Sequence, residues 1–287
     1  MNCMLIQYLN CPNCSGILSW NIIDLQYENI IKASMYCANC AAEYFVHDGI
    51  ACFVSTKNEF QQALEYEKEL TSNSTEKYIY TSDTQKAIDE CIQATNKEIM
   101  NIHSGSIILD FAAGHGTLFT NLCKRTDLIY IVNDIDIGSL IHIKIANQSK
   151  DEINVNYLAF DARYSPFRNK CITFALSLLG LQHIVDYQTC LLELKRIVAN
   201  DIIHISSFCP ENDKLNLFVL KSKKLLDMWL ENNFYKVLSF HNINYNIIYK
   251  TQAFVKGVEK EKGQKYIGKD NFPVTDTTFY YSVTKLY

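Results

Sequence analysis

The sequence predicts an α/β protein, in which a doubly wound parallel sheet follows a small metal-binding module. After residue 107, short apolar runs alternate with amphipathic stretches, which is typical of parallel strands flanked by helices. The first run leads into a turn that contains Gly114 and Gly116, two of only ten glycines in the chain. Such a turn lets the backbone approach a ligand at a helix N-terminus. Two Cys-x-x-Cys pairs near the N-terminus predict the metal module.

Length and charge limit the class of protein. The 287 residues include 27 Lys and Arg against 31 Asp and Glu, a formal net charge of −4, which argues against a generally basic nucleic-acid binder. The most apolar stretch, residues 171–185, is shorter than the roughly 18 to 20 residues of a membrane span. The N-terminus has no basic region before its apolar run, unlike a signal peptide. We therefore expect a cytoplasmic protein without a membrane span.

Four of the eleven cysteines have the spacing of zinc ligands. Cys11 and Cys14 form one pair and Cys37 and Cys40 the other, with twenty-two residues between the pairs. Each pair places two sulfurs on one turn, and two such turns complete a closed four-thiolate site for a structural zinc ion. A redox Cys-x-x-Cys, the alternative, is expected as a single pair beside a βαβ unit. Residues 1–55 contain one basic residue against four acidic ones, which does not suit a phosphate-binding ribbon.

The remaining elements are expected in a regular order. Residues 57–106 are polar with helical periodicity, and residues 71–75 predict a loop that interrupts it. Strands are expected at 107–111, 128–133, 155–160 and 202–206, a strand and loop at 174–184, and helices at 117–124 and 191–198. We divide the chain into a zinc ribbon (1–56), a helical linker or cap (57–106) and a cofactor-binding domain (107–287). A dinucleotide fingerprint is excluded, because its third glycine would fall at Phe119.

The glycine turn resembles a known cofactor-binding motif. Residues 110–116, Asp-Phe-Ala-Ala-Gly-His-Gly, are similar to the Asp-x-(Ala/Gly)-x-Gly-x-Gly motif of class I S-adenosylmethionine-dependent methyltransferases. The resemblance continues in order through Tyr-Ser-Pro-Phe at 164–167 and the Leu-x-Glu-x-x-Arg helix at 191–198. The family's Pro-Gly-Gly turn is replaced by Ala-Asn-Asp at 199–201. The resemblance implies a seven-stranded Rossmann-like methyltransferase sheet that uses S-adenosylmethionine.

The same resemblance implies the roles of individual residues. The cofactor-binding residues it indicates are Asp110, Ala112, Gly114, His115, Gly116, Asp134, Asp161 and Ala162. Asp134 corresponds to the acid that binds the ribose hydroxyls, since a carboxylate can accept two such hydrogen bonds, and Asp136 is the alternative. Asp161 corresponds to the acid that accepts the adenine amino group. His183 is a candidate general base, or a histidine that only lines the pocket.

Two resemblances bear on the acceptor. The cysteine pairs, together with Tyr-Phe-Val at 44–46 and Asp-Gly-Ile at 48–50, resemble the zinc ribbons that precede many bacterial methyltransferases. This order of domains also resembles bacterial ribosomal-RNA guanine methyltransferases, whereas the second half is similar to quinone-biosynthesis and other small-molecule methyltransferases. We predict in-line methyl transfer to an O, N or C atom of a small-molecule or peptide acceptor. The alternatives are an RNA methyltransferase and a catalytically degenerate scaffold whose ribbon contacts a protein partner.

The C-terminal third has an uneven charge. Residues 214–269 contain eleven lysines and no arginine, against four acidic residues, a local charge of +7 with aromatic residues interspersed. Basic and aromatic residues together occur in nucleic-acid grooves. Lysines without arginine do not suit bidentate recognition of phosphate or guanine, and a solvated lysine face over aromatic strands is the alternative. The sequence therefore favours a small acceptor over RNA.

Overall fold

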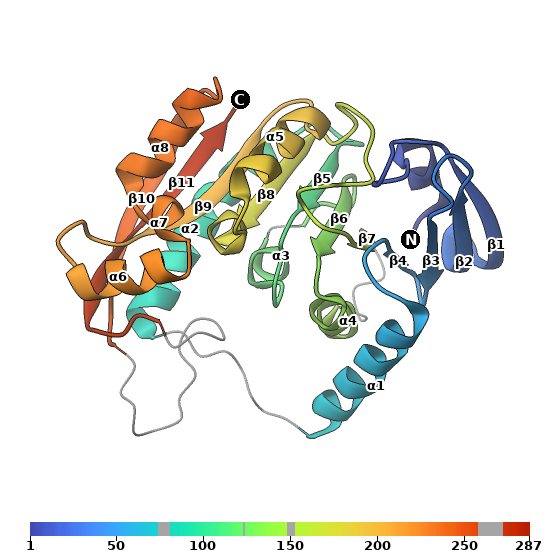
Figure 1. Ribbon diagram of the computed structural model, residues 1–287, viewed down its shortest axis with the longest axis horizontal. Coiled ribbons are helices and arrows are strands. Elements are labelled where there is room, and N and C mark those ends of the chain that lie inside the picture. The colour runs from blue at the N-terminus through green and yellow to red at the C-terminus, as the bar shows by residue number, and fades with distance from the viewer. Residues whose placement is uncertain (74–80, 123, 148–152, 258–271) are drawn as a thin grey trace. The chain divides into compact units, whose positions relative to one another are not determined.

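The computed structural model describes residues 1–73, 81–122, 124–147, 153–257 and 272–287 (Figure 1). The chain forms two compact units. The first contains Met1–Ser74, Ile102–Gly180 and Gln188–Ile202, and the second contains Thr75–Asn101, Leu181–Tyr187 and Ile203–Tyr287. In the described part of the chain, no helix has the length and apolar character that crossing a membrane requires. The division of the chain at residues 56 and 106 stays a prediction.

The N-terminal part of the first unit is a small antiparallel sheet. It follows a 3₁₀ helix, η1 (Cys3–Tyr8), and consists of β1 (Leu18–Gln26), β2 (Asn29–Cys37), β3 (Glu43–His47) and β4 (Ile50–Cys52). Each strand pairs with the next in the chain. The β1–β2 hairpin fills the long gap between the two cysteine pairs, so both pairs lie at the same end of the hairpin.

The same sheet continues into parallel strands. β4 pairs in parallel with β7 (Asn154–Ala159), and the neighbours that follow are β6 (Ile129–Asp134), β5 (Ile107–Asp110) and β8 (Phe174–Leu178). The strand order of the first unit is therefore β1-β2-β3-β4-β7-β6-β5-β8. The predicted α/β fold class, with a parallel sheet and a four-cysteine module at the N-terminus, is confirmed. The module is joined to the sheet edge, which the sequence did not indicate.

Burial explains why the central strands are apolar until the polar residues at their carboxyl ends. Every residue of β5 and β6 is buried, as expected for parallel strands covered on both faces. The helices of this part are α1 (Lys57–Asn73), α3 (Thr117–Asn121), α4 (Ile137–Ala146) and α5 (Tyr187–Ile197). α3 ends three residues before the predicted Lys124, since Leu122 has an extended backbone with ψ 144°.

The prediction of a loop at residues 71–75 is wrong for residues 71–73. α1 continues through Asn73, and residues 74 and 75 lie outside the described part of the chain. Ser, Thr and Asn have weak helix propensity, but each residue that extends an existing helix adds a hydrogen bond, and packing stabilises the whole helix. α1 packs against α4, which supplies that stabilisation.

The second unit combines a short sheet with helices. Its strands are β9 (Ile202–Phe208), β10 (Tyr245–Val255) and β11 (Thr277–Leu286), in the order β9-β11-β10. Its helices are α2 (Ser82–Met100), α6 (Lys214–Ser222), α7 (Leu226–Trp229) and α8 (Glu231–Phe240), with the short η2 (Gly180–His183). α2 packs on β10, where Glu90 accepts hydrogen bonds from Tyr249 Oη at 3.1 Å and Thr251 Oγ1 at 2.7 Å.

Candidate functional site

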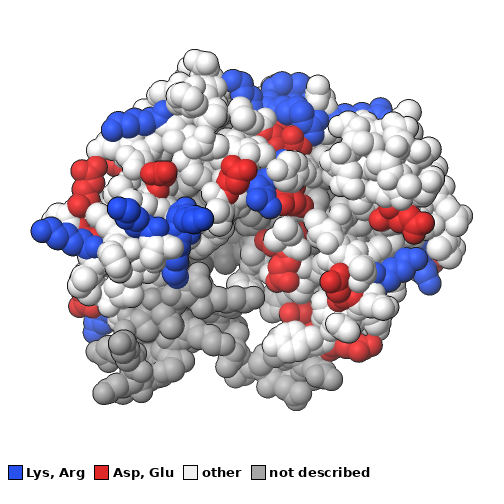
Figure 2. Space-filling view, viewed as in Figure 1, with Lys and Arg blue, Asp and Glu red and all other residues white. Residues whose placement is uncertain are grey.

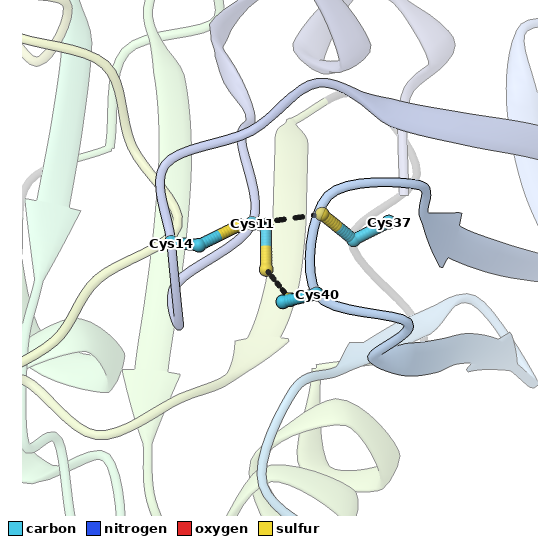
Figure 3. A group of neighbouring side chains, drawn as sticks. All are labelled: Cys11, Cys14, Cys37 and Cys40. Atoms are coloured by element: carbon cyan, nitrogen blue, oxygen red, sulfur yellow. Dashed lines mark hydrogen bonds between the residues drawn. The ribbon is translucent and has the colours of Figure 1, made fainter.

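The four predicted zinc ligands come together in the first unit (Figure 3). Their Sγ atoms all lie within 4.8 Å of one another, with Cys11 and Cys40 3.5 Å apart and Cys14 and Cys37 3.4 Å apart. Zinc–sulfur bonds of about 2.3 Å in a tetrahedron place sulfurs about 3.8 Å apart. The donor set therefore fits one structural zinc ion and leaves no coordination position for a substrate.

The surroundings favour the thiolate form, which binds metal, at Cys37. Burial raises the pKa of the Cys37 thiol, but hydrogen bonds from the Cys40 N–H, the Cys14 thiol and the Asn39 N–H lower it to about 7. At Cys14 and Cys40, backbone hydrogen bonds at Gly16 and Ala42 lower the pKa, but hydrogen bonds with neighbouring thiols contribute to a net rise. The Tyr44 hydroxyl lies 3.3 Å from Cys11 Sγ. These neighbours would orient and charge-stabilise the sulfurs around an ion.

Gly16 is a residue of this centre that sequence analysis missed. A Cβ atom at this position would lie 2.7 Å from Asn39 Nδ2 and 3.2 Å from Cys14 Sγ. A side chain there would displace the Asn39 side chain and crowd the Cys14 sulfur. The only available signal was a glycine two residues after the second cysteine.

The glycine turn follows β5 and has an unusual backbone. Ala112, Gly114 and Gly116 all have positive φ, at 48°, 55° and 74°. A Cβ atom at Gly116 would lie 2.7 Å from Ile143 Cγ1, whereas one at Gly114 would meet no heavy atom within 4 Å. Gly116 is thus required for packing, and Gly114 leaves the backbone open to a ligand.

The turn is hydrogen-bonded to the predicted ribose acid. The Gly114 N–H donates to Asp134 Oδ2 at 2.7 Å, and the Asp136 N–H donates to Asp134 Oδ1 at 2.9 Å. Each carboxylate oxygen has two lone pairs, so each keeps one for a hydroxyl group. The structure therefore brings the end of β6 to the glycine turn at the end of β5.

Asp136, the alternative ribose acid, has a structural partner. It is the N-cap of α4, where its Oδ2 accepts from the Ser139 N–H at 3.3 Å and from Ser139 Oγ at 2.8 Å. A capping carboxylate satisfies a helix N–H that otherwise lacks a partner. Of the two acids, Asp134 is the one that faces the turn.

Asp161 and Ala162 follow β7, and Asp161 is engaged by a neighbour. Arg163 donates from Nε to Asp161 Oδ1 at 3.0 Å and from Nη2 to Oδ2 at 2.6 Å. Burial raises the pKa of the Asp161 carboxyl, but hydrogen bonds from Arg163 lower it below its usual value. To donate to Asp161, an adenine amino group would have to share the carboxylate oxygens with Arg163 or displace Arg163 from them. Ala162 is buried beside Asp161.

Asp110 at the end of β5 is fully buried. Among the described residues, neither oxygen of its carboxyl has a hydrogen-bond partner that meets ordinary distance criteria. Burial, reinforced by the nearby Asp134 charge, raises the pKa of Asp110 to about 8. A buried acid kept protonated at neutral pH is expected, since an unpaired charge in the interior is costly.

Asp110→Asn is expected to stabilise the unliganded protein in a pH-dependent way. The folded protein keeps a proton on Asp110 up to about pH 8, while the unfolded chain releases it near pH 4. Stability therefore falls as pH rises from about 4 to about 8, and the asparagine removes this loss. Urea unfolding should show a difference that grows across this range, to at least about 1 kcal/mol at pH 8. Free energies of unfolding of variant and parent that instead differ by the same amount at every pH would contradict the burial of an ionisable Asp110. A difference equal to that found for the exposed control Asp89→Asn would contradict it as well.

The two predicted histidines lie in different units. The ring of His115, in the glycine turn, is 6.2 Å from the ring of His142, whose Nδ1 is 3.6 Å from Glu67 Oε2. His183 belongs to the second unit, where its ring packs against Trp229 with centroids 6.1 Å apart. The cofactor-binding residues predicted from the sequence all belong to the first unit.

Two residues that sequence analysis missed hold the turn in place. Asn133 is buried between strand ends, and its Nδ2 donates to the Leu158 carbonyl at 3.1 Å and the Phe160 carbonyl at 2.9 Å. A Cβ atom at Gly180 would lie 2.9 Å from Ala112 Cβ. The sequence shows Asn133 directly before the predicted ribose acid, although not its burial. Gly180 matched no motif.

The segment after β7 is tied to α5. Glu193 Oε1 accepts from the Ser165 N–H at 2.9 Å and from Ser165 Oγ at 2.7 Å. Arg196 donates to both oxygens of Glu193, at 2.6 and 2.8 Å. The glutamate and arginine of the Leu-x-Glu-x-x-Arg helix therefore fix this segment.

Comparisons with known proteins agree with this geometry. Residues 109–204 match the family model described as a methyltransferase domain. The protein YcgJ from Bacillus subtilis has a TM-score of 0.54 and 14% identity, covering 69% of this chain and 97% of its own. A protein assigned as a sarcosine dimethylglycine methyltransferase from Galdieria sulphuraria has a TM-score of 0.52 and 12% identity, covering 78% and 98%.

A further neighbour shows that this fold also supports other chemistry. The [4+2]-cyclase SpnF has a TM-score of 0.51 and 10% identity, covering 79% of this chain and 92% of its own. No curated protein sequence matches this chain. At these identities the structural likeness establishes the fold, and function has to be argued from the site itself.

Proposed function

We propose that this chain, whose residues 109–204 belong to the methyltransferase domain family, transfers a methyl group from S-adenosylmethionine to an O, N or C atom of a small-molecule or peptide acceptor. The observation that carries the proposal is the hydrogen bond between the Gly114 N–H and Asp134. It joins an open glycine turn to a carboxylate with free lone pairs at the carboxyl ends of neighbouring parallel strands. Ligands of open α/β sheets bind at this edge.

The residues of the turn suit each part of the cofactor. Asp134 would accept both ribose hydroxyls, because each of its oxygens keeps a lone pair. Ile135, the next residue, is 55% exposed and offers an apolar surface to the adenine ring. Asp161 would accept the adenine amino group after sharing its bonds with Arg163, and Ala162 would pack beside it. Asp110, His115 and the backbone of Ala112, Gly114 and Gly116 would surround the methionine part.

Methyl transfer mainly requires the protein to position the reacting groups. When bound, S-adenosylmethionine supplies an electrophilic methyl group on a sulfonium, which is a good leaving group. The chain's part is to hold the acceptor in line and to exclude water. We propose His183 as the base that removes a proton from the acceptor, with lining of the pocket as the alternative role.

Charge favours a small acceptor over RNA. Lys250, one of the lysines between residues 214 and 269, forms an ion pair with Glu231, which uses part of the local positive charge. Lys260, Lys262, Lys265 and Lys269 lie outside the described residues. The formal net charge of −4 also gives no general attraction to phosphates. We keep a structural zinc ion at the four cysteines, and a protein partner bound through the ribbon, as parts of the same proposal.

The transfer assay uses radiolabelled S-adenosylmethionine and an extract of cells that lack the protein. We expect label in a solvent-extractable or peptide fraction, and a loss of label with His183→Asn that is at least about tenfold at saturating cofactor. Label in RNase-sensitive material would overturn the small-acceptor proposal and favour the RNA alternative. Tight binding of S-adenosylhomocysteine without transfer to any fraction would favour the degenerate scaffold. A His183→Asn variant with unchanged rate and unchanged pH profile would exclude the base role.

A further inference from the structure

A polar cleft of about 430 Å³ lies in the first unit, beside the cysteine centre. One wall is the first cysteine turn, with Asn10 and Ser15, and the other is the segment after β7 together with α5. The side chains that matter on the second wall are Ser165, Arg168, Asn169 and Arg196. Among the described residues, none of those that line the cleft is acidic. Figure 2 shows Lys and Arg side chains gathered over α5, at the upper edge of that view.

Backbone hydrogen bonds fix the two walls together. Leu9 and Phe167 form an isolated antiparallel β-bridge. On either side of it, the Asn10 N–H donates to the Pro166 carbonyl at 2.7 Å and the Arg168 N–H donates to the Tyr8 carbonyl at 2.9 Å. The cleft therefore has rigid sides, which keeps its polar groups in place before a ligand arrives.

The polar groups of the cleft are arranged as hydrogen-bond donors. Arg168 Nε donates to Asn10 Oδ1 at 3.1 Å, and Arg196 Nη1 donates to Asn169 Oδ1 at 2.8 Å. With both amide oxygens engaged by guanidinium groups, the amide NH₂ groups of the two asparagines are left to donate. Arg196 is balanced by Glu193, whereas Arg168 forms no ion pair with any described residue.

We infer that this cleft binds an anionic group of the phosphate class. The Arg168 guanidinium, whose two amino groups have no partner among the described residues, lies beside amide donors and the Ser15 hydroxyl and matches the oxygens of a phosphate. The Glu193 carboxylate is already engaged by Arg196 and Ser165. The acidic balance of residues 1–55 does not suit phosphate binding by that segment alone. The positive charge of the cleft comes instead from Arg168 and Arg196, which lie outside that segment. The inference does not depend on methyl transfer. The group could belong to a phosphorylated small molecule or to a nucleic-acid backbone, and the experiment separates these sources.

The test uses the full-length, zinc-loaded protein with inorganic phosphate as the probe, in a buffer free of other multivalent anions. We expect calorimetry to give a dissociation constant of about 10 mM or tighter. Arg168→Gln should weaken binding at least about tenfold, and Arg168→Lys should retain part of it, since it keeps the charge but not the fork of donors. Lys57→Gln, an exposed position outside the cleft with the same change of charge, is the control.

Two results would overturn the inference. One is a parent protein that binds no phosphate, and the other is equal phosphate binding by Arg168→Gln and Lys57→Gln. If the parent binds no phosphate and Arg168→Gln also loses zinc, Arg168 only balances the thiolate charge of the cysteine centre. S-adenosylhomocysteine binding is measured on the same samples. A parent protein that binds S-adenosylhomocysteine but no phosphate would contradict this inference and leave the proposed function intact.

The source of the phosphate follows from two further titrations. A nucleoside monophosphate and a single-stranded RNA oligonucleotide are compared at two salt concentrations. An Arg168-dependent monophosphate affinity that changes little between the two salts supports a phosphorylated small molecule. An Arg168-dependent oligonucleotide affinity that falls steeply with salt supports a nucleic-acid backbone. Binding of either ligand that is the same in Arg168→Gln would contradict the site.

Discussion

Cys11→Ser is expected to remove the bound metal and to unfold the four-cysteine module. The module is small, and the sulfur cluster joins its two cysteine turns, with all four Sγ atoms within 4.8 Å of one another. For sites of this kind metal binding and folding share one free energy, about 10 to 16 kcal/mol in isolated zinc peptides. Metal analysis should give about one zinc per parent chain and none per variant. Hydrogen exchange should become fast in β1 to β4.

The unfolding is expected to reach β7 because β4 pairs with it directly. Residues 50–52 lie opposite residues 157–159, so amides at this edge should lose protection as well. Cys3→Ser is the matched control, since Cys3 lies in η1 and is not part of the sulfur cluster. A Cys11→Ser protein that keeps its zinc, or that keeps slow exchange in β2 and β3, would show that the cluster is not a closed four-thiolate site.

The second large effect is expected at the cofactor turn. Asp134→Ala should weaken S-adenosylhomocysteine binding at least about 100-fold, because two hydrogen bonds to a charged acceptor are worth about 1.5 to 3 kcal/mol each. The variant also removes the acceptor of the Gly114 N–H, which loosens the turn. Isothermal titration calorimetry at neutral pH measures the effect directly, with circular dichroism as the check on folding.

Asp136→Ala separates binding from stability. Asp136 caps α4, so its loss should cost about 1 kcal/mol of stability. Binding of S-adenosylhomocysteine should stay within a few-fold of the parent. If Asp136→Ala instead abolishes binding while Asp134→Ala leaves it intact, the two acids have been assigned in the wrong order.

The sequence predicted features that depend on local pattern. The spacing of the four cysteines indicated the sulfur cluster, and the apolar runs indicated β5, β6, β7 and β9. The glycine turn was visible because Gly114 and Gly116 follow a strand at once. In each case neighbouring residues in the chain carry the signal, so no knowledge of distant contacts is needed.

Features that depend on distant contacts were not visible. The pairing of β4 with β7 joins residues about one hundred positions apart, and a three-residue strand carries little periodicity. Gly180 matters only because Ala112 packs against it, and the bond between Arg163 and Asp161 altered the expectation for an adenine-binding acid. The donor-lined cleft combines residues from two ends of the first unit, each unremarkable alone.

The pairing of β4 with β7 also determines which strand forms the free edge of the sheet. A bare β7 would present the backbone groups of a buried, apolar strand to any other chain, which invites aggregation. With β4 in place, the free edge of this part of the sheet moves to β1. β1 carries Asp24 and has register irregularities around it, two features that discourage edge-to-edge association. The four-cysteine segment thus covers the edge of the parallel sheet that β7 would otherwise expose.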